Sequence, residues 1–284
     1  MPDGVVIVDK PAGMTSHDVV DEVRRRFATR KVGHGGTLDP DATGVLVLGL
    51  GKATRFLDYS RATPKRYQAH AVFGITTSTQ DASGEVLERS DVPVKRATLS
   101  EVLAGFTGAL EQVPPMVSAV RIGGERLYEK ARRGEEVTRA ARPVTVHSLE
   151  LTGFSGREAS FDVLCSAGTY IRTLVHDIGQ ALGCGAHLKT LRRTEAGGFD
   201  IEDAVPLADL AQRDLKPLSA AVRGMPRMDL DRACALMVSR GRPIDGGDTR
   251  AEEGERVALL HDGLLVAVYR RSHDRLVAER VVPS

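Results

Sequence analysis

The sequence is poor in cysteine and in aromatic residues. It holds 3 cysteines, no tryptophan, 5 tyrosines and 7 phenylalanines among 284 residues. The cysteines stand at positions 165, 184 and 234, their number is odd, and they form no Cys-x-x-Cys pair. This usage favours reduced thiols in a cytoplasmic protein over a disulfide framework. A zinc site built from Cys184 and His187 would need two more ligands, and the sequence offers no second pair.

Long apolar runs are also missing. No stretch approaches the roughly 18 apolar residues that a membrane-spanning helix needs. The opening residues MPDGVVIVDK lack the basic and apolar regions of a signal peptide. We therefore expect a cytoplasmic protein without a membrane span.

Excess charge of one sign is absent from the chain as a whole, whose net charge is +1. Two local stretches differ from this average. Residues 24–31 carry five positive charges and no acid, and residues 120–142 carry seven basic and four acidic groups. Such stretches either follow a nucleic-acid backbone or form ordinary solvated helix faces, and their charge alone does not decide between these two interpretations.

Hydrophobic periodicity predicts a mixture of helices and strands. Thr15 and Asp18 fit a capping box, so a helix is expected to begin there. The predicted helices are 15–28, 98–110 and 169–183, and the predicted strands are 4–11, 45–50, 66–74, 144–154 and 159–168. Strict strand–helix alternation is lacking, which favours an α+β fold with a mixed, largely antiparallel sheet flanked by helices.

The pattern changes after about residue 213. A linker is expected over 213–228 because it holds two prolines, followed by a short helix over 230–243. Three strands are predicted near 256–260, 264–270 and 275–282. We therefore expect a catalytic domain over 1–225 and a small β-rich domain over 226–284.

One segment, KVGHGGTLDPDATGVLVLGLGKAT (31–54), combines six glycines with Asp39, Asp41 and His34 ahead of a buried strand. Its spacing does not fit a phosphate-binding P-loop, because Ala53 follows Gly51-Lys52 and Leu46 replaces the first glycine. An EF-hand beginning at Asp39 would place Leu50 at the bidentate glutamate position, and a dinucleotide-binding glycine pattern does not fit either. What remains is a polar loop with a carboxylate suited to nucleophilic or general-base chemistry, or an ordinary Asp-Pro turn.

Five segments of the chain resemble the sequence motifs of the bacterial tRNA pseudouridine-55 synthases, the TruB family. They are DKPAGMTSHDVV (9–20), GHGGTLDPDATGVLVLGLGKAT (33–54), KRYQAHAVFGITTSTQDASGEV (65–86), QVPPMVSAVRIGGERLYEKARRGEEVTRAARPVTV (112–146) and CSAGTYIRTLVHDIGQALGCGAHLKTLRRTEAGGF (165–199). They occur in the family's order. The chain departs from the family pattern at Gly35, where threonine or alanine is commoner, and at Asp41, where an apolar residue is usual.

The resemblance implies that one uridine, at position 55 in the T-arm loop of tRNA, is isomerised to pseudouridine. Asp39 matches the family's catalytic aspartate, and Arg172 matches an arginine that pairs with that carboxylate. Tyr67 matches the tyrosine that stacks on the target base, and Tyr170 and Leu191 match residues that line the uracil pocket.

Further roles also follow from the resemblance. His34 matches a histidine that contacts RNA and helps to hold flipped-out nucleotides, while Lys10 is expected to be structural or close to a phosphate. The resemblance implies no metal and no cofactor. Residues 226–284 lie where the family carries a PUA-like RNA-binding domain. We expect tRNA as the partner, with no protein partner required, and a monomer.

Three other functions are weighed against this one. A nucleoside or glycoside hydrolase could use Asp39 with Asp41 or Asp81, and it would release a free base. A non-catalytic RNA-binding or RNA-chaperone protein on the same scaffold would bind tRNA without turnover. A sister synthase that acts with guide partners is disfavoured, because the chain is compact and has no charged tails.

Overall fold

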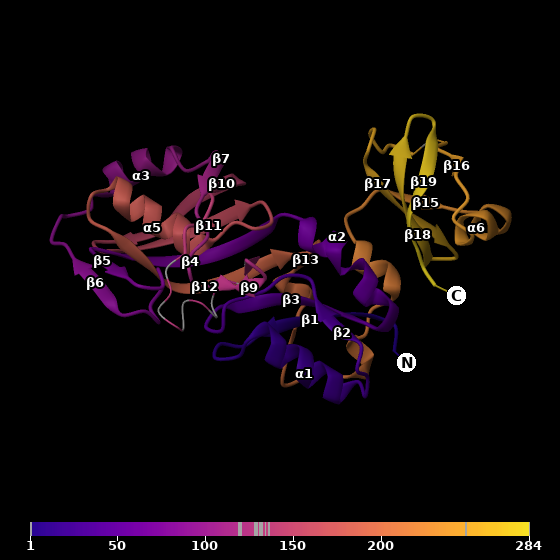
Figure 1. Cartoon of the computed structure of the whole chain (residues 1–284), viewed down its shortest axis with the longest axis horizontal. Helices are drawn as coiled ribbons and strands as arrows, with labels where there is room; N and C mark the ends of the chain where they lie inside the picture. The colour runs from indigo at the N-terminus through magenta and orange to yellow at the C-terminus, as the bar shows by residue number, and fades with distance from the viewer. Residues whose placement is uncertain are drawn as a thin grey trace. The chain divides into compact units, whose positions relative to one another are not determined.

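The computed structural model describes residues 2–118, 121–127, 130, 133, 135, 137–247 and 249–283. The chain folds into two compact units. Unit 1 comprises residues 1–40, 44–63 and 196–284, and unit 2 comprises residues 41–43 and 64–195. Figure 1 shows helices and strands intermixed along the chain, which confirms the predicted α+β class. Within the basic stretch 120–142, residues 120, 128, 129, 131, 132, 134 and 136 lie outside the described residues.

Unit 1 contains a sheet in the order β14-β1-β3, and β2 also pairs with β3. Helices α1 and α2 belong to the same N-terminal part of unit 1. The bounds are β1 Gly4–Lys10, α1 Ser16–Arg26, β2 Val32–His34, β3 Thr43–Leu50, α2 Leu57–Ala62, β13 Phe199–Asp200 and β14 Val205–Pro206. Strands β1 and β3 are antiparallel, with Gly4 opposite Leu50 and Lys10 opposite Gly44.

Strands β1 and β3 are buried on both faces, which explains their almost continuous apolar sequence. One face packs against α1 through Val6, Leu46 and Leu48 of the sheet and Val19 and Val23 of the helix (Figure 1). The capping box predicted at Thr15 and Asp18 forms as expected, with both of its hydrogen bonds present. The predictions for residues 4–11, 15–28 and 45–50 are confirmed.

The C-terminal part of unit 1 forms a second sheet in the order β15-β17-β18-β19-β16 with α6 beside it. The bounds are β15 Arg227–Asp229, α6 Arg232–Ser239, β16 Ile244–Asp245, β17 Arg256–His261, β18 Leu264–Ser272 and β19 Arg275–Val281. The β-rich character of this tail is confirmed. Ala258, Leu260, Leu265 and Val268 belong to the same buried cluster as Val5, Ile7, Val45 and Val47.

The expectation of a linker over 213–228 is wrong. The 3₁₀ helices Gln212–Asp214 and Leu218–Val222 lie in this segment, and Ala221 and Val222 are buried in the same cluster as Val5. Lys216 also exchanges backbone hydrogen bonds with Val5 of β1. The two prolines therefore shape a packed segment.

Unit 2 is built on an antiparallel sheet in the order β4-β11-β10-β7, with β12 on the other side of β4. Helices α3 and α5 pack on it (Figure 1). The bounds are β4 Lys65–Phe73, β5 Ile75–Thr77, β6 Val86–Arg89, α3 Arg96–Ala104, β7 Gly108–Gln112, β8 Arg121–Ile122, β9 Glu125–Arg126, β10 Arg142–Ser155, β11 Glu158–Cys165, α5 Ile171–Ala181 and β12 Ala186–Ala196. No described helix is long and apolar enough to cross a membrane.

The helix predicted over 98–110 is wrong at its end. Helix α3 stops at Ala104, and Gly105 caps it with backbone bonds to Leu103 and Val102. Gly108 then takes φ +102°, which glycine adopts without steric cost, and the chain continues as β7. Within the predicted range 98–110, Leu99 and Leu103 are buried on α3, whereas Phe106 lies beyond the helix.

Candidate active site

In unit 1, Asp39 is held in the loop that joins β2 to β3. Its side chain is half-buried, and both of its chain neighbours are fixed by bonds from the segment 10–16. The buried hydroxyl of Ser16 accepts a hydrogen bond from the Leu38 N–H at 2.8 Å and donates to the Leu38 carbonyl at 3.1 Å. On the other side, the Pro40 carbonyl accepts from Lys10 Nζ at 2.8 Å and from the Gly13 N–H at 3.0 Å. The backbone on each side of Asp39 is therefore fixed.

Lys10 is fully buried, and its ammonium group is satisfied by the protein backbone. Besides Pro40, it donates to the carbonyls of Pro11 and Met14 at 2.8 and 2.6 Å. These bonds tie the turn after β1 to the Asp39 loop. The structure thus gives Lys10 a structural role, one of the two roles expected for it.

The two departures from the family pattern lie on either side of Asp39. Asp41 is exposed. Gly35 is buried, and a Cβ added there would lie 2.8 Å from Ser60 Oγ. The Ser60 hydroxyl is buried and has no hydrogen-bond partner within the described residues. Gly35 is thus matched to the serine that packs beside it.

His34 ends β2, and its side chain is half-buried. The carbonyl of His34 accepts hydrogen bonds from Arg61 Nη2 at 2.9 Å and Nε at 3.3 Å. Its Nδ1 accepts a weaker bond from the Gly36 N–H at 3.4 Å. Unit 1 therefore brings two of the predicted site residues, His34 and Asp39, into one constrained loop.

The other four predicted site residues belong to unit 2. Tyr67 lies on β4, where it is buried and paired with Val163 of β11. Leu191 is half-buried on β12, the strand beside β4. Tyr170 and Arg172 stand at the beginning of α5. Unit 2 thus gathers these residues onto two adjacent strands and the helix that packs on them.

Arg172 is almost completely buried and is held by a small network. Its Nη1 donates to the Thr79 carbonyl at 3.1 Å, and its Nη2 donates to the Val117 carbonyl at 2.9 Å. Asp81 Oδ2 lies 3.5 Å from Nη1, while Asp81 Oδ1 accepts bonds from Thr79 Oγ1 and Ser83. Asp81, weighed from sequence as a hydrolase carboxylate, is instead a partner of Arg172.

Gln112 fixes the backbone of Tyr170, a role that sequence reasoning missed. Its Oε1 accepts from the Tyr170 N–H at 3.0 Å, and its Nε2 donates to the Tyr170 carbonyl at 3.3 Å. Gln112 is buried at the end of β7. Ser16 was missed in the same way. Both residues lie inside the segments that resemble the family, which is the only signal that pointed to them.

A buried cationic pair lies close to Tyr67. Lys65 and Arg193 are both buried, on β4 and β12. Burial, followed by the charge of Arg193, lowers the pKa of Lys65 to about 8. Burial also raises the pKa of the neighbouring Cys165 thiol to about 11, which keeps that thiol protonated and unreactive.

Comparison with known proteins identifies the family. A model described as "TruB family pseudouridylate synthase (N terminal domain)" matches residues 24–171, and one described as "tRNA pseudouridylate synthase B C-terminal domain" matches residues 172–225. The chain belongs to the TruB family of tRNA pseudouridine synthases. It is accordingly an isomerase that acts on uridine in tRNA.

Curated relatives and solved structures agree with this assignment. The chain is 46% identical to tRNA pseudouridine synthase B of Paenarthrobacter aurescens, over 94% of this chain and 91% of that protein. It is 46% identical to the Mycobacterium bovis protein of the same name, over 91% of this chain and 92% of that protein. A chain from the "Crystal Structure of a Cbf5-Nop10-Gar1 Complex" is 29% identical with a TM-score of 0.79, covering 99% of this chain and 86% of that chain.

Proposed function

We propose that this TruB-family enzyme converts uridine 55, in the T-arm loop of tRNA, to pseudouridine, with Asp39 as the catalytic carboxylate. The observation that carries the proposal is the fixed backbone around Asp39, held by Ser16 at Leu38 and by Lys10 and Gly13 at Pro40. A catalytic group must be kept within a fraction of an ångström of its productive position. Asp41, two residues later, is exposed, whereas Asp39 is half-buried.

The reaction needs a carboxylate and a way to hold the base. The C1′–N1 bond breaks, the uracil rotates, and a C1′–C5 bond forms. The hydrogen on C5 leaves as a proton, and N1 gains one, so atoms and electrons balance without an oxidant. Arg172 is proposed as the second catalytic residue, with its guanidinium already oriented by Thr79, Val117 and Asp81.

The remaining predicted residues are proposed to bind the RNA. The target base must leave its stack to be reached, at a cost of a few kcal/mol. Tyr67 stacks on the base, and Tyr170 and Leu191 line the uracil pocket. His34 contacts the flipped-out nucleotides. Residues 226–284 are proposed as a PUA-like RNA-binding domain, and the enzyme is proposed to act on tRNA in the cytoplasm as a monomer without a protein partner.

A tritium-release assay with the purified chain tests this function. A T-arm hairpin labelled with tritium at C5 of the target uridine should release its label to water, with no free uracil. Release should stop when cytidine replaces that uridine. Free uracil would identify a hydrolase, and tight binding without release would identify an RNA-binding protein.

Asp39→Asn tests the catalytic assignment. The substitution keeps the volume but removes the charge, so we expect turnover to fall at least ~10³-fold while the melting temperature and RNA affinity stay nearly unchanged. Asp41→Asn is the matched control, because it makes the same change in the same loop, and it should be nearly silent. An Asp39→Asn enzyme with more than about a tenth of normal activity would contradict the assignment.

A further inference from the structure

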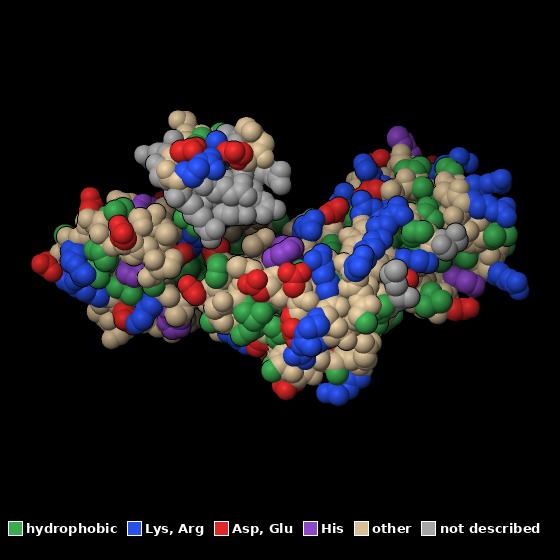
Figure 2. Space-filling model, turned by 60° about the horizontal axis from the view of Figure 1, so that its bottom comes forward, with side chains coloured by type: hydrophobic (Ala, Val, Ile, Leu, Met, Phe, Trp, Pro, Cys, Tyr) green, Lys and Arg blue, Asp and Glu red, His purple; other side chains and the backbone are tan. Residues whose placement is uncertain are grey.

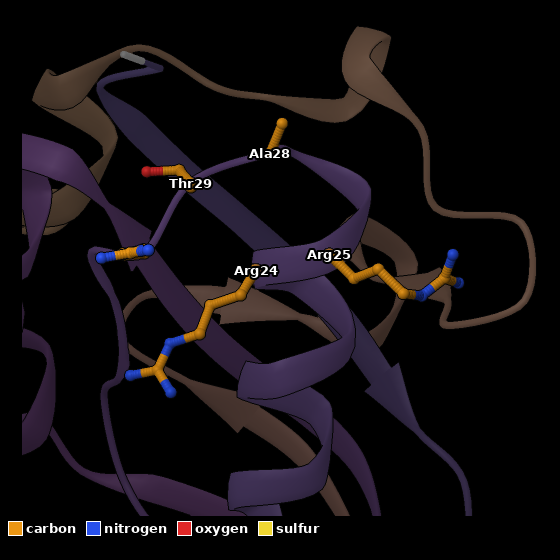
Figure 3. A pocket seen from close by; sticks show the side chains of 5 residues that line it. Arg24, Arg25, Ala28 and Thr29 are labelled. Atoms are coloured by element: carbon orange, nitrogen blue, oxygen red, sulfur yellow. The ribbon is translucent and has the colours of Figure 1, made fainter.

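A basic hollow lies at the C-terminal end of α1 in unit 1, and it is lined by none of the residues proposed for catalysis. It has a volume of about 610 Å³ and is lined by Arg24, Arg25, Ala28, Thr29 and Arg30. Figure 3 shows Arg24 and Arg25 leaving the last turn of α1 in different directions, with Ala28 and Thr29 in the turn that follows. We call this feature the α1 hollow. Its lining holds three arginines and no carboxylate.

The local backbone makes the end of α1 compatible with an anion. A helix C-terminus ordinarily presents free carbonyls, which repel anions. Here the N–H groups of Phe27, Ala28 and Thr29 donate to the carbonyls of Val23, Arg25 and Arg24 respectively. Ala28 takes φ +46° to close this turn. The last carbonyls are therefore satisfied within the chain.

The positively charged side chains around the α1 hollow outnumber the carboxylates that pair with them. Arg24 pairs with Asp21 at 2.8 Å, and Arg25 and Arg26 share Glu22 at 2.6 Å each. Hydrogen bonds from these two arginines lower the pKa of Glu22 to about 2. Within the part of the chain that the structure describes, no carboxylate pairs with Arg30 or with the adjacent Lys31, and both side chains are exposed. Residues 21–31 thus carry a net charge of +3.

We propose that the α1 hollow binds a backbone phosphate of the tRNA substrate. This inference rests on the proposed function, which supplies the RNA. Arginine forks match the geometry of phosphate oxygens, and an open, exposed, cationic hollow suits a phosphodiester that passes along the surface. On the face that Figure 2 draws, Lys and Arg side chains lie both beside Asp and Glu and in groups of their own, and the lining of the α1 hollow holds no acid.

The phosphate bound there does not flank the reacting nucleotide. Lys31 and Val32 lie beside Gly51 and Leu50, at one end of β3, whereas Pro40 is bonded to Lys10, which pairs with Gly44 at the other end. The six residue steps from Gly44 to Leu50 span roughly 20 Å. The contact is therefore with a more distant part of the RNA, and it contributes to affinity and not to the chemical step.

Arg30 is the residue to change, because its side chain is exposed and makes no bond within the described residues that folding would lose. Arg30→Ala should weaken tRNA binding about twofold to fivefold at low salt, the scale of one exposed ion pair. It should also reduce the slope of log Kd against log salt concentration by about 1. Arg30→Glu should weaken binding more, and kcat at saturating tRNA should be unchanged in both.

Arg96→Ala is the matched control, since Arg96 is an exposed arginine on α3 of unit 2 and its loss changes the net charge equally. The proposal would be overturned if Arg30→Ala bound tRNA with the affinity and the salt dependence of wild type. It would also be overturned if Arg96→Ala lost as much tRNA affinity as Arg30→Ala. Saturable binding of inorganic phosphate at Arg30, with tRNA affinity unaffected by either Arg30 variant, would identify a free-anion site and also overturn it. Tritium release by the wild-type enzyme tests the proposed function separately.

Discussion

At the scale of single residues, Ser16 shows how the chain holds its proposed catalytic group. Its hydroxyl makes two bonds to the backbone of Leu38, and it lies 22 positions away in the sequence. Ser16→Ala would leave both backbone groups of Leu38 without these bonds in a buried site. We expect kcat for pseudouridine formation to fall about tenfold or more, with the KM for tRNA within about twofold, because the loss acts on the position of Asp39 and not on RNA contacts.

Ser60→Ala is the control for this prediction. Ser60 is as buried as Ser16, each with 3% of its surface exposed, but its hydroxyl has no partner among the described residues. The same chemical change should therefore leave kcat and the melting temperature almost unaffected. Equal kcat values for the two variants would show that the Ser16 bonds do not position Asp39.

Lys65 gives a prediction for stability against pH. Its pKa in the folded protein is lowered to about 8 from an ordinary value near 10.5, so between these pH values the unfolded chain binds more protons. The cost of burying this charge is fully present below pH 8 and disappears as the pH rises towards 10.5. We expect the free energy of unfolding of wild type, relative to Lys65→Met, to increase over this window. A difference that stays constant with pH in denaturant titrations would contradict the lowered pKa.

At the scale of elements, the sequence predicts local structure well and packing poorly. Helix α1 and strands β1 and β3 were predictable because their signals, a capping box and short apolar runs, lie within a few residues. Helix α3 was predicted too long because its apolar spacing continues past Ala104, while Gly105 and Gly108 end it. Strand β12 gave no clear signal, because charged and polar residues occupy more than half of it.

The candidate site shows the same contrast between local motifs, which the sequence reveals, and packing contacts, which it does not. Asp39, Arg172 and their companions were predicted from motifs, and the structure describes the place of each. Their supporting groups were not predictable, because Ser16 reaches Leu38 across 22 positions and Gln112 reaches Tyr170 across 58. The segment 213–228 was mistaken for a linker because its prolines are visible in the sequence, whereas its packing against Val5 is not.

At the scale of the whole molecule, residues 226–284 share a buried core with the N-terminal strands. Leu260 and Val268 pack in one cluster with Val5 and Val47. Nearby, the guanidinium groups of Arg256 and Arg280 lie 5.4 and 5.2 Å from the centroid of the Tyr59 ring, within the range of cation–π attraction. The tail therefore contributes to the stability of unit 1 in addition to the RNA binding proposed for it.

Deletion of residues 226–284 separates these two contributions. Residues 1–225 keep every proposed site residue. We expect them to fold with a lower melting temperature, because the cluster around Val5 and Val47 loses its contacts with the tail.

Leu260→Ala in the full chain is the control. It should lower the free energy of unfolding by about 2–5 kcal/mol, the usual cost of such a core cavity, while leaving tRNA affinity unchanged. The truncated protein should bind tRNA more weakly than the Leu260→Ala variant when both are measured well below their melting temperatures. Equal tRNA affinity for the truncated and full chains would remove the tail from the RNA-binding surface, and an unchanged melting temperature after truncation would show that the shared cluster does not stabilise unit 1.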